Sequence, residues 1–183
     1  LSCNPAIGGL AKGHLVRELD ALGGLMARVT DASSIQFRTL NTRKGLAVRS
    51  SRAQVDIHRY PAEMQARLAA IDGLAVIEGE VAALHTTAGR IAGVVLRDGR
   101  RFSTSRVILT TGTFLAGVLH CGHTQTEGGR AGDGAAHRLS HSLSALGIRL
   151  GRLKTGTVPR LAHRSIDWAR LDEQTDTVPG GHF

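Results

Sequence analysis

The first part of the chain carries apolar residues at helical spacing. Three leucines recur at i, i+4 and i+7, at Leu15, Leu19 and Leu22. This spacing predicts a helix from about Gly13 that has an apolar stripe and ends at Gly23-Gly24. A second helical pattern covers residues 53–71, where Pro61 predicts either a kink or the start of a new helix.

Extended segments are expected between and after these helices. They are residues 25–30, 35–40, 75–84, 90–97 and 101–110, with a further short strand over 149–152. The runs from 75 to 110 form a predicted β-meander, because turn residues Ala88-Gly89 and Asp98-Gly99 separate them and Asp-Gly favours a hairpin. The third of these runs is continuously apolar over residues 107–109, which is typical of a strand covered on both faces.

Two glycine-rich loops each precede a predicted helix. Gly8-Gly9 lie before the first helix, and residues 128–134 lie before a helix expected over about 135–146. Free N–H groups at a helix start can hold an anion, although an ordinary loop-to-helix junction has the same short glycine pattern. Thr111, Gly112 and Thr113 follow the apolar strand, where open α/β sheets bind ligands.

The charge balance favours a polyanionic partner such as nucleic acid. Lys and Arg number 23 against 15 Asp and Glu, which gives a formal charge of +8 and a pI near 10.9. An alanine-, arginine- and glycine-rich composition is also typical of a GC-rich genome. The aromatic content of 3% argues against a surface that stacks on single-stranded bases.

Positive side chains gather in one predicted loop and its flank. They are Arg43, Lys44, Arg49 and Arg52. Two interpretations stay open: a solvated basic loop, or a site for phosphate or carboxylate groups, whose oxygens match the fork of an arginine.

The two cysteines, Cys3 and Cys121, lie far apart and do not indicate a disulfide framework, so a reducing compartment fits better. His120-Cys121-Gly122-His123 has no second cluster with ligand spacing, so we interpret it as a polar loop and expect no metal site. Cys3 precedes a helix start and Lys12, which would lower the pKa of a thiol; a buried structural cysteine is the alternative.

Several other signals are absent from the sequence. It contains no apolar run long enough to cross a membrane and no signal-peptide pattern, so we expect a soluble, cytoplasmic protein. No G-x-S-x-G elbow, Walker A motif or complete G-x-G-x-x-G supports a hydrolase or P-loop interpretation. Because motif-dense sequence begins directly at Leu1 and the tail closes no domain, we expect a fragment truncated at both ends.

Five longer motifs occur in a defined order. They are SCNPAIGGLAKGHLVRELDALGGLM (2–26), IQFRTLN-x-x-KG-x-AV-x-x-x-RAQ-x-D (35–56), LTTGTFL-x-G (109–117), GGRAGD (128–133) and GRLKTGT-x-PR (151–160). In this order the chain resembles, over almost its whole length, the MnmG/GidA family of tRNA uridine 5-carboxymethylaminomethyl modification enzymes. Two departures are Leu46 and Val158, where the family pattern has prolines, and a third is Ala136 in place of a serine.

The resemblance implies an α/β fold: a Rossmann-like FAD/NAD(P)-binding domain with a β-meander. Residues 1–153 would be the FAD-binding domain without its first βα unit, and residues 154–183 the start of an inserted NADH-type domain. The implied cofactors are FAD and, in the full-length protein, NADH. The implied partners are tRNA, the GTPase MnmE, methylene-tetrahydrofolate as one-carbon donor and a second copy in a homodimer. Residues 1–183 alone are expected to be inactive and not to hold FAD.

The resemblance also assigns roles to individual residues. Cys3 matches a family cysteine implicated in catalysis. The implied cofactor-binding residues are Asn4, Pro5, Ala6, Gly8, Gly9, Val81, Thr111, Gly112, Thr113 and Ala136. Arg43, Lys44 and Arg52 are candidates for the active-site rim or for tRNA phosphates.

Two other functions stay open on the sequence. A generic FAD-dependent oxidoreductase would act on a small molecule and be insensitive to added tRNA. A non-catalytic basic RNA-binding module would bind tRNA and retain no flavin.

Overall fold

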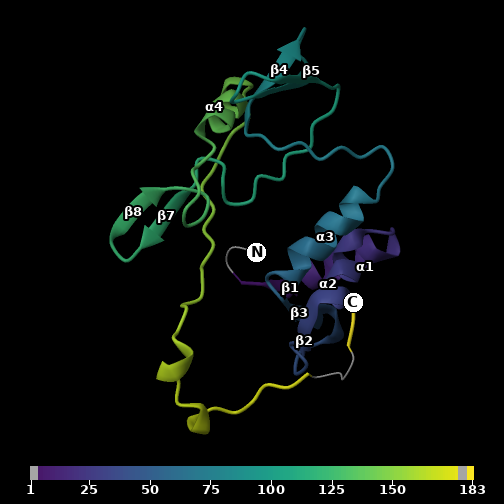
Figure 1. The fold of residues 1–183 in the computed structure, drawn as a ribbon, viewed down its shortest axis with the longest axis vertical. Coiled ribbons are helices and arrows are strands. Elements are labelled where there is room, and N and C mark those ends of the chain that lie inside the picture. Colours follow the sequence, from purple (N-terminus) through teal and green to yellow (C-terminus); the bar gives the residue numbers. More distant parts are fainter. Residues whose placement is uncertain (1–3, 177–180) are drawn as a thin grey trace. The chain divides into compact units, whose positions relative to one another are not determined.

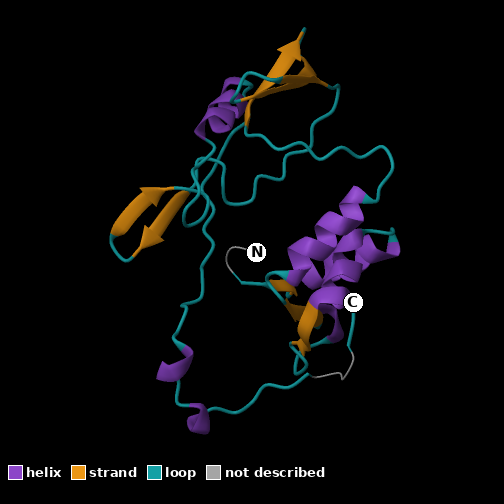
Figure 2. Cartoon of the chain, viewed as in Figure 1, coloured by secondary structure: helices purple, strands orange, loops and turns teal. Residues whose placement is uncertain are grey.

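The computed structural model describes residues 4–176 and 181–183, which form two compact units (Figures 1 and 2). Unit 1 comprises residues 1–76 together with 155–183, and unit 2 comprises residues 77–154. Unit 1 is therefore built from two stretches of chain that are distant in sequence. The assignment of residues 1–153 and 154–183 to two domains stays a prediction.

Unit 1 is a three-stranded antiparallel sheet with helices packed beside it. The strand order is β1-β3-β2. The strands are β1 (Ala6–Gly8), β2 (Ser34–Leu40) and β3 (Ser50–Val55), and the helices are α1 (Lys12–Ala21), α2 (Leu25–Ser33) and α3 (Arg59–Ala69). Short 3₁₀ turns occur at Leu46–Val48, His163–Ser165 and Trp168–Arg170.

The predicted first helix is confirmed as α1, but its apolar stripe is wrong. Gly13 and Val16 are the buried residues of α1, whereas Leu15, Leu19 and Leu22 are exposed, Leu22 to 86%. The reason is close packing. A Cβ on Gly13 would overlap the side chain of Ser50, so the helix backbone approaches β3 directly and the leucines face away from it.

The strand predicted over residues 25–30 is also wrong, because this segment is the helix α2. Its buried residues are Ala27, Val29, Thr30 and Ser33, a helical spacing. The hydroxyls of Thr30 and Ser33 donate to the carbonyl oxygens of Met26 and Val29, at 2.6 and 2.7 Å, so their polar groups are satisfied within the helix. The strand predicted over residues 35–40 is confirmed as β2.

The helix predicted over residues 53–71 is two elements. Residues 50–55 are the strand β3, and α3 begins at Arg59. Pro61 lies in the first turn of α3, where its missing N–H costs no intrahelical bond, so the alternative of a new helix near Pro61 is confirmed. Asp56 Oδ1 accepts hydrogen bonds from the N–H groups of His58 and Arg59, both at 2.8 Å.

This capping makes the stability of unit 1 depend on pH. The N–H groups of Arg59 and His58 hold the pKa of Asp56 below its usual value. The unfolded carboxyl therefore takes up its proton at a higher pH than the folded one. The Asp56 carboxylate therefore contributes its full stabilisation of the folded state above the unfolded pKa of about 3.9. This stabilisation is lost as the pH falls through the folded pKa.

We expect Asp56→Asn, which keeps an acceptor but does not titrate, to show a smaller loss of stability on acidification than wild type. Urea unfolding at about pH 5.5 and about pH 3 measures the difference. An identical loss in both proteins would show that other carboxyl groups carry the pH dependence.

The second stretch of unit 1 lies against β2, which is an edge strand. The Gln36 amide donates to the Gln174 carbonyl oxygen, and the Phe37 N–H donates to Asp176 Oδ1 at 2.7 Å. The rings of Phe37 and Phe183 meet edge to face at 5.6 Å. The bond to Asp176 occupies part of the open edge of the sheet, and Phe183 packs against the hydrophobic core of unit 1.

Unit 2 holds the predicted β-meander, but its first strand begins at Val81 and not at residue 75. Its strands are β4 (Val81–Thr87), β5 (Arg90–Leu96) and β6 (Arg101–Ser103), followed by the hairpin β7 (Val118–Cys121) and β8 (Thr124–Glu127) and by helix α4 (His137–Ala145). The meander is antiparallel in the order β4-β5-β6, with turns at the predicted Ala88-Gly89 and Asp98-Gly99. Helix α4 packs on β4, where the Leu84 N–H donates to the Ser142 hydroxyl at 3.0 Å. The helix predicted over 135–146 is thus confirmed.

Two strand predictions for unit 2 are wrong. Residues 106–110 are not a buried strand: β6 ends at Ser103, and Ile108 is 90% exposed. The Thr104 hydroxyl donates to the Arg106 carbonyl oxygen and accepts from the Arg106 N–H, forming a local turn where pairing with β5 stops. The strand expected over residues 149–152 is irregular chain, and the polar loop expected around Cys121 is the β7–β8 hairpin.

In the described parts of the chain, no helix is long and apolar enough to cross a membrane.

Candidate functional site

The predicted cofactor-binding stretch over residues 4–9 is held by hydrogen bonds to β3. The Val55 N–H donates to the Pro5 carbonyl oxygen at 2.8 Å, and the Gln54 amide donates to Asn4 Oδ1 at 3.2 Å. Ala6 lies opposite Gln54 in the sheet register. Cys3, the predicted catalytic residue, lies outside the described residues.

Gly8 and Gly9 end this stretch with unusual backbone angles. Their φ values are +95° and +106°, a region that residues with a Cβ rarely adopt. A Cβ on Gly8 would overlap the carbonyl oxygen of Ser51, whereas one on Gly9 would meet nothing within 4 Å. Gly8 is therefore required for packing on β3, and Gly9 presents bare backbone to open space.

The predicted basic residues separate into two places. Arg52 lies in β3 opposite Gly8, and it donates to the Gln54 side-chain oxygen at 3.2 Å. Arg43 and Lys44 lie in the exposed β2–β3 connection. The structure thus brings Arg52 next to the glycine stretch.

A pocket lined by basic side chains, here named the basic pocket, opens beside this stretch in unit 1 with a volume of about 250 Å³. Its residues come from α1, β2, β3 and the β2–β3 connection. The lining contains two arginines and a histidine but no carboxylate. The full set is Gly13, His14, Arg17, Thr39, Arg49, Ser50 and Ser51.

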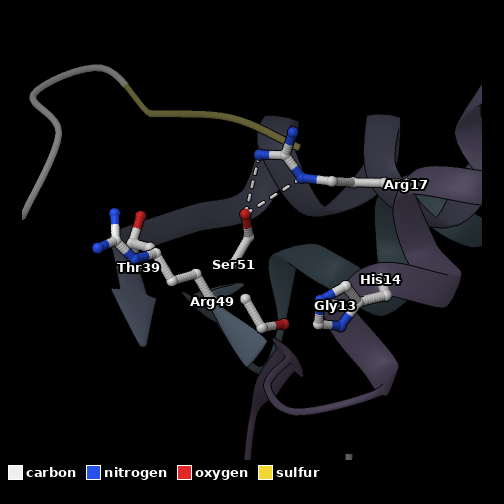
Figure 3. A pocket seen from close by; sticks show the side chains of 7 residues that line it. Gly13, His14, Arg17, Thr39, Arg49 and Ser51 are labelled. Carbon is white, nitrogen blue, oxygen red and sulfur yellow. Dashed lines mark hydrogen bonds between the residues drawn. The ribbon is translucent and has the colours of Figure 1, made fainter. Parts of the chain in front are cut away.

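Hydrogen bonds fix the wall and the floor of the basic pocket. Arg17 donates to the Ser51 hydroxyl from Nε at 3.2 Å and from Nη2 at 2.9 Å (Figure 3). Ser50 donates to the Gly9 carbonyl oxygen at 2.5 Å, and the Gly9 N–H donates to the Ser51 carbonyl oxygen at 2.8 Å. Figure 3 shows Arg49 on the other side of Ser51 from His14 in that view. Ser50 and Ser51 therefore line the pocket and also hold Gly9 of the glycine stretch by hydrogen bonds.

Sequence reasoning missed most of the basic pocket. Arg49 belongs to the basic cluster of the sequence but not to the predicted site residues, and Arg17 and His14 belong to neither. One signal is present in the sequence, because Gly13, His14 and Arg17 share one face of a predicted helix at spacings of three and four. The partners in β2 and β3 require knowledge of the strand pairing.

In unit 2 the structure brings together the predicted residues around the second glycine-rich loop. The Thr113 hydroxyl donates to the Gly129 carbonyl oxygen at 2.6 Å, and the Ala136 N–H donates to the Phe114 carbonyl oxygen at 2.8 Å. Gly112 has a φ of +56°, and a Cβ there would meet nothing within 4 Å. Thr111, Gly112, Thr113 and Ala136 therefore form one local cluster, although no buried strand precedes it.

Three further features of unit 2 concern the glycine-rich loop, the start of α4 and the predicted residue Val81. Arg130 and Asp133 form an ion pair that closes the glycine-rich loop. Ala136 is the N-cap residue of α4 and has no side chain to cap it, so the alanine at this position leaves the helix start uncapped by its own residue. Val81 is the first residue of β4 and lies opposite Leu96 in the sheet register.

Within residues 4–176 and 181–183, no group of three or more His, Cys, Asp or Glu side chains is arranged to hold a metal ion. Cys121 is an exposed free thiol.

Comparison with known proteins identifies relatives of the whole chain. The model of the family "Glucose inhibited division protein A" matches residues 1–183. The tRNA uridine 5-carboxymethylaminomethyl modification enzyme MnmG of Myxococcus xanthus is 58% identical over 95% of the chain, and that of Pelobacter propionicus is 56% identical over all of it. The chain spans 28% and 29% of these two relatives.

Solved structures give the same result for the fold. Two crystal forms of Aquifex aeolicus GidA match with TM-scores of 0.88 and 0.87, at 42% and 43% identity. The matches cover 98% and 96% of this chain. They cover 30% and 29% of the two Aquifex aeolicus chains. The predicted α/β fold class is confirmed. Because the family model spans the whole chain and the relatives are more than half identical, the chain belongs to the glucose inhibited division protein A (GidA) family.

Proposed function

We propose that the full-length protein is an FAD-dependent enzyme that modifies the wobble uridine of tRNA, adding the 5-carboxymethylaminomethyl group. The observation that carries this proposal is the identity of 56–58%, over 95% or more of the chain, to enzymes named for that modification. The chain spans less than a third of those enzymes. The proposal therefore concerns the whole protein and not residues 1–183 alone.

The residues present are compatible with FAD. A flat aromatic cofactor needs surfaces where backbone is not covered by side chains, and Gly9 and Gly112 each offer such a surface in their own unit. The residues proposed to hold FAD are Asn4, Pro5, Ala6, Gly8, Gly9, Val81, Thr111, Gly112, Thr113 and Ala136. When bound, FAD would supply two-electron redox chemistry.

Catalysis is assigned to a thiol, and binding of the tRNA backbone is assigned to basic side chains. We assign Cys3 as the catalytic thiol, because it adjoins the stretch over residues 4–9 that is anchored on β3. Arg43, Lys44 and Arg52 are assigned to tRNA phosphates, since arginines and lysines neutralise such groups; Arg43 and Lys44 are exposed and Arg52 is half-buried. NADH, methylene-tetrahydrofolate, the GTPase partner MnmE and a homodimer in the cytoplasm complete the proposal for the full-length protein.

Purified full-length protein tests this proposal. We expect it to retain a flavin absorption spectrum and, when given NADH, a methylene folate, glycine as the source of the carboxymethylamino part, GTP and the GTPase partner, to raise the mass of uridine in unmodified tRNA. Nucleoside mass spectrometry measures that change. NADH oxidation that tRNA does not affect would favour a small-molecule oxidoreductase, and tRNA binding without flavin would favour a non-catalytic RNA-binding module.

A further inference from the structure

We propose that the basic pocket of unit 1 binds one backbone phosphate of the RNA substrate, held between Arg17 and Arg49. This inference rests on the proposed function, which supplies tRNA as the substrate. It adds a site that is distinct from the candidate residues Arg43, Lys44 and Arg52.

The composition of the basic pocket suits an oxyanion. Arg17, Arg49 and His14 line it together with the hydroxyls of Thr39, Ser50 and Ser51. Arg17, Arg49, His14 and the Ser51 hydroxyl have donors for an oxyanion, whereas the Ser50 hydroxyl already donates to the Gly9 carbonyl oxygen. The lining contains no carboxylate that would compete for the arginines. Such a set matches a phosphate in charge and in donors.

Both arginines of the basic pocket are held in place by hydrogen bonds to neutral acceptors. The Arg17 guanidinium donates twice to one neutral acceptor, the Ser51 hydroxyl, at 3.2 and 2.9 Å. Arg49 donates from Nε to the Lys44 carbonyl oxygen at 3.2 Å. Neither arginine forms an ion pair with a carboxylate of the described residues. Each is thus held in place without its charge being neutralised, so less entropy is lost when a phosphate binds.

The basic pocket has a buried floor and an exposed basic rim. Gly13, Ser50 and Ser51 form a buried floor, whereas Arg17 and Arg49 are exposed at the rim. A phosphate that enters from this rim can stay attached to a chain that continues outside. Arg43 and Lys44 lie on the same exposed connection as Arg49, where they would meet the neighbouring phosphates. This layout favours a polymer over a free phosphate.

The test uses full-length protein and unmodified tRNA, with dissociation constants measured over a range of salt concentrations. We expect Arg49→Ala to weaken tRNA binding about tenfold and to make the slope of log K against log salt shallower by about one unit. Arg49→Lys should restore the slope, because it restores the charge, but only part of the affinity, because the fork is lost. The flavin spectrum should not change in either variant.

Arg90→Ala is the matched control, since Arg90 is an exposed arginine of β5 outside the pocket. We expect its affinity and slope to stay within about twofold of wild type. Equal losses in Arg49→Ala and Arg90→Ala would overturn the inference in favour of a general charge effect. Loss of flavin in Arg49→Ala would reassign the pocket to a cofactor phosphate. Arg49-dependent binding of inorganic phosphate, with unchanged tRNA affinity, would reassign it to a free anion.

The two proposals fail separately. If wild-type protein modifies tRNA and Arg49→Ala binds it with unchanged affinity and slope, the pocket inference is wrong and the proposed function stands. If the protein binds tRNA through Arg49 but does not modify it, the pocket inference stands and the proposed function is wrong.

Discussion

Replacing Gly8 by alanine in the full-length protein should lower the free energy of unfolding of unit 1 by about 3 kcal/mol. The new Cβ would overlap the carbonyl oxygen of Ser51, which is strand backbone and cannot move aside as a flexible side chain would. The φ of +95° adds strain of its own for any residue with a Cβ. Urea unfolding followed by circular dichroism measures the change.

The adjacent glycine provides the control. Gly9 has a similar φ of +106°, but a Cβ there meets nothing within 4 Å. Gly9→Ala should therefore cost only the backbone strain, about 1–2 kcal/mol. Equal destabilisation of the two variants would show that the overlap with Ser51 is relieved by a small shift of β3.

Cys3→Ser should abolish tRNA modification in the full-length protein while leaving the flavin spectrum nearly unchanged. A serine hydroxyl is close in size to the thiol but is a far weaker nucleophile at neutral pH, so binding survives and chemistry does not. Nucleoside mass spectrometry measures the modification, and absorbance measures the bound flavin.

Cys121→Ser is the matched variant, because Cys121 is an exposed free thiol in the β7–β8 hairpin. We expect it to retain modification activity. If Cys3→Ser loses flavin and activity together, Cys3 is a structural residue and the catalytic assignment is wrong.

Elements whose signals are local were predictable from the sequence. The meander β4-β5-β6 and its turns at Ala88-Gly89 and Asp98-Gly99 follow from turn chemistry, which acts over a few residues. Helix α4 and its preceding glycine-rich loop follow for the same reason. The five motifs indicate the family, since they are long and occur in order.

Elements decided by tertiary packing were not predictable in this way. Val29 and Thr30 are β-branched and favour a strand, but burial of one helical face of α2 outweighs that weak preference. The leucine stripe of α1 failed because Gly13 allows a closer approach to β3 on another face. The basic pocket was not predictable because Arg17 and Ser51, 34 positions apart, meet only through the packing of α1 on β3.

The discontinuity of unit 1 bears on the order in which the protein folds during synthesis. Residues 77–154 are contiguous and can begin to fold as soon as they leave the ribosome. The edge of β2, in contrast, gains its contact with Asp176 only after residues 77–154 have been made. At about 5–20 residues per second, synthesis of the intervening unit leaves that strand edge open for several seconds. During that time the unpaired N–H and C=O groups of β2 can pair with another chain, which a chaperone bound there would prevent.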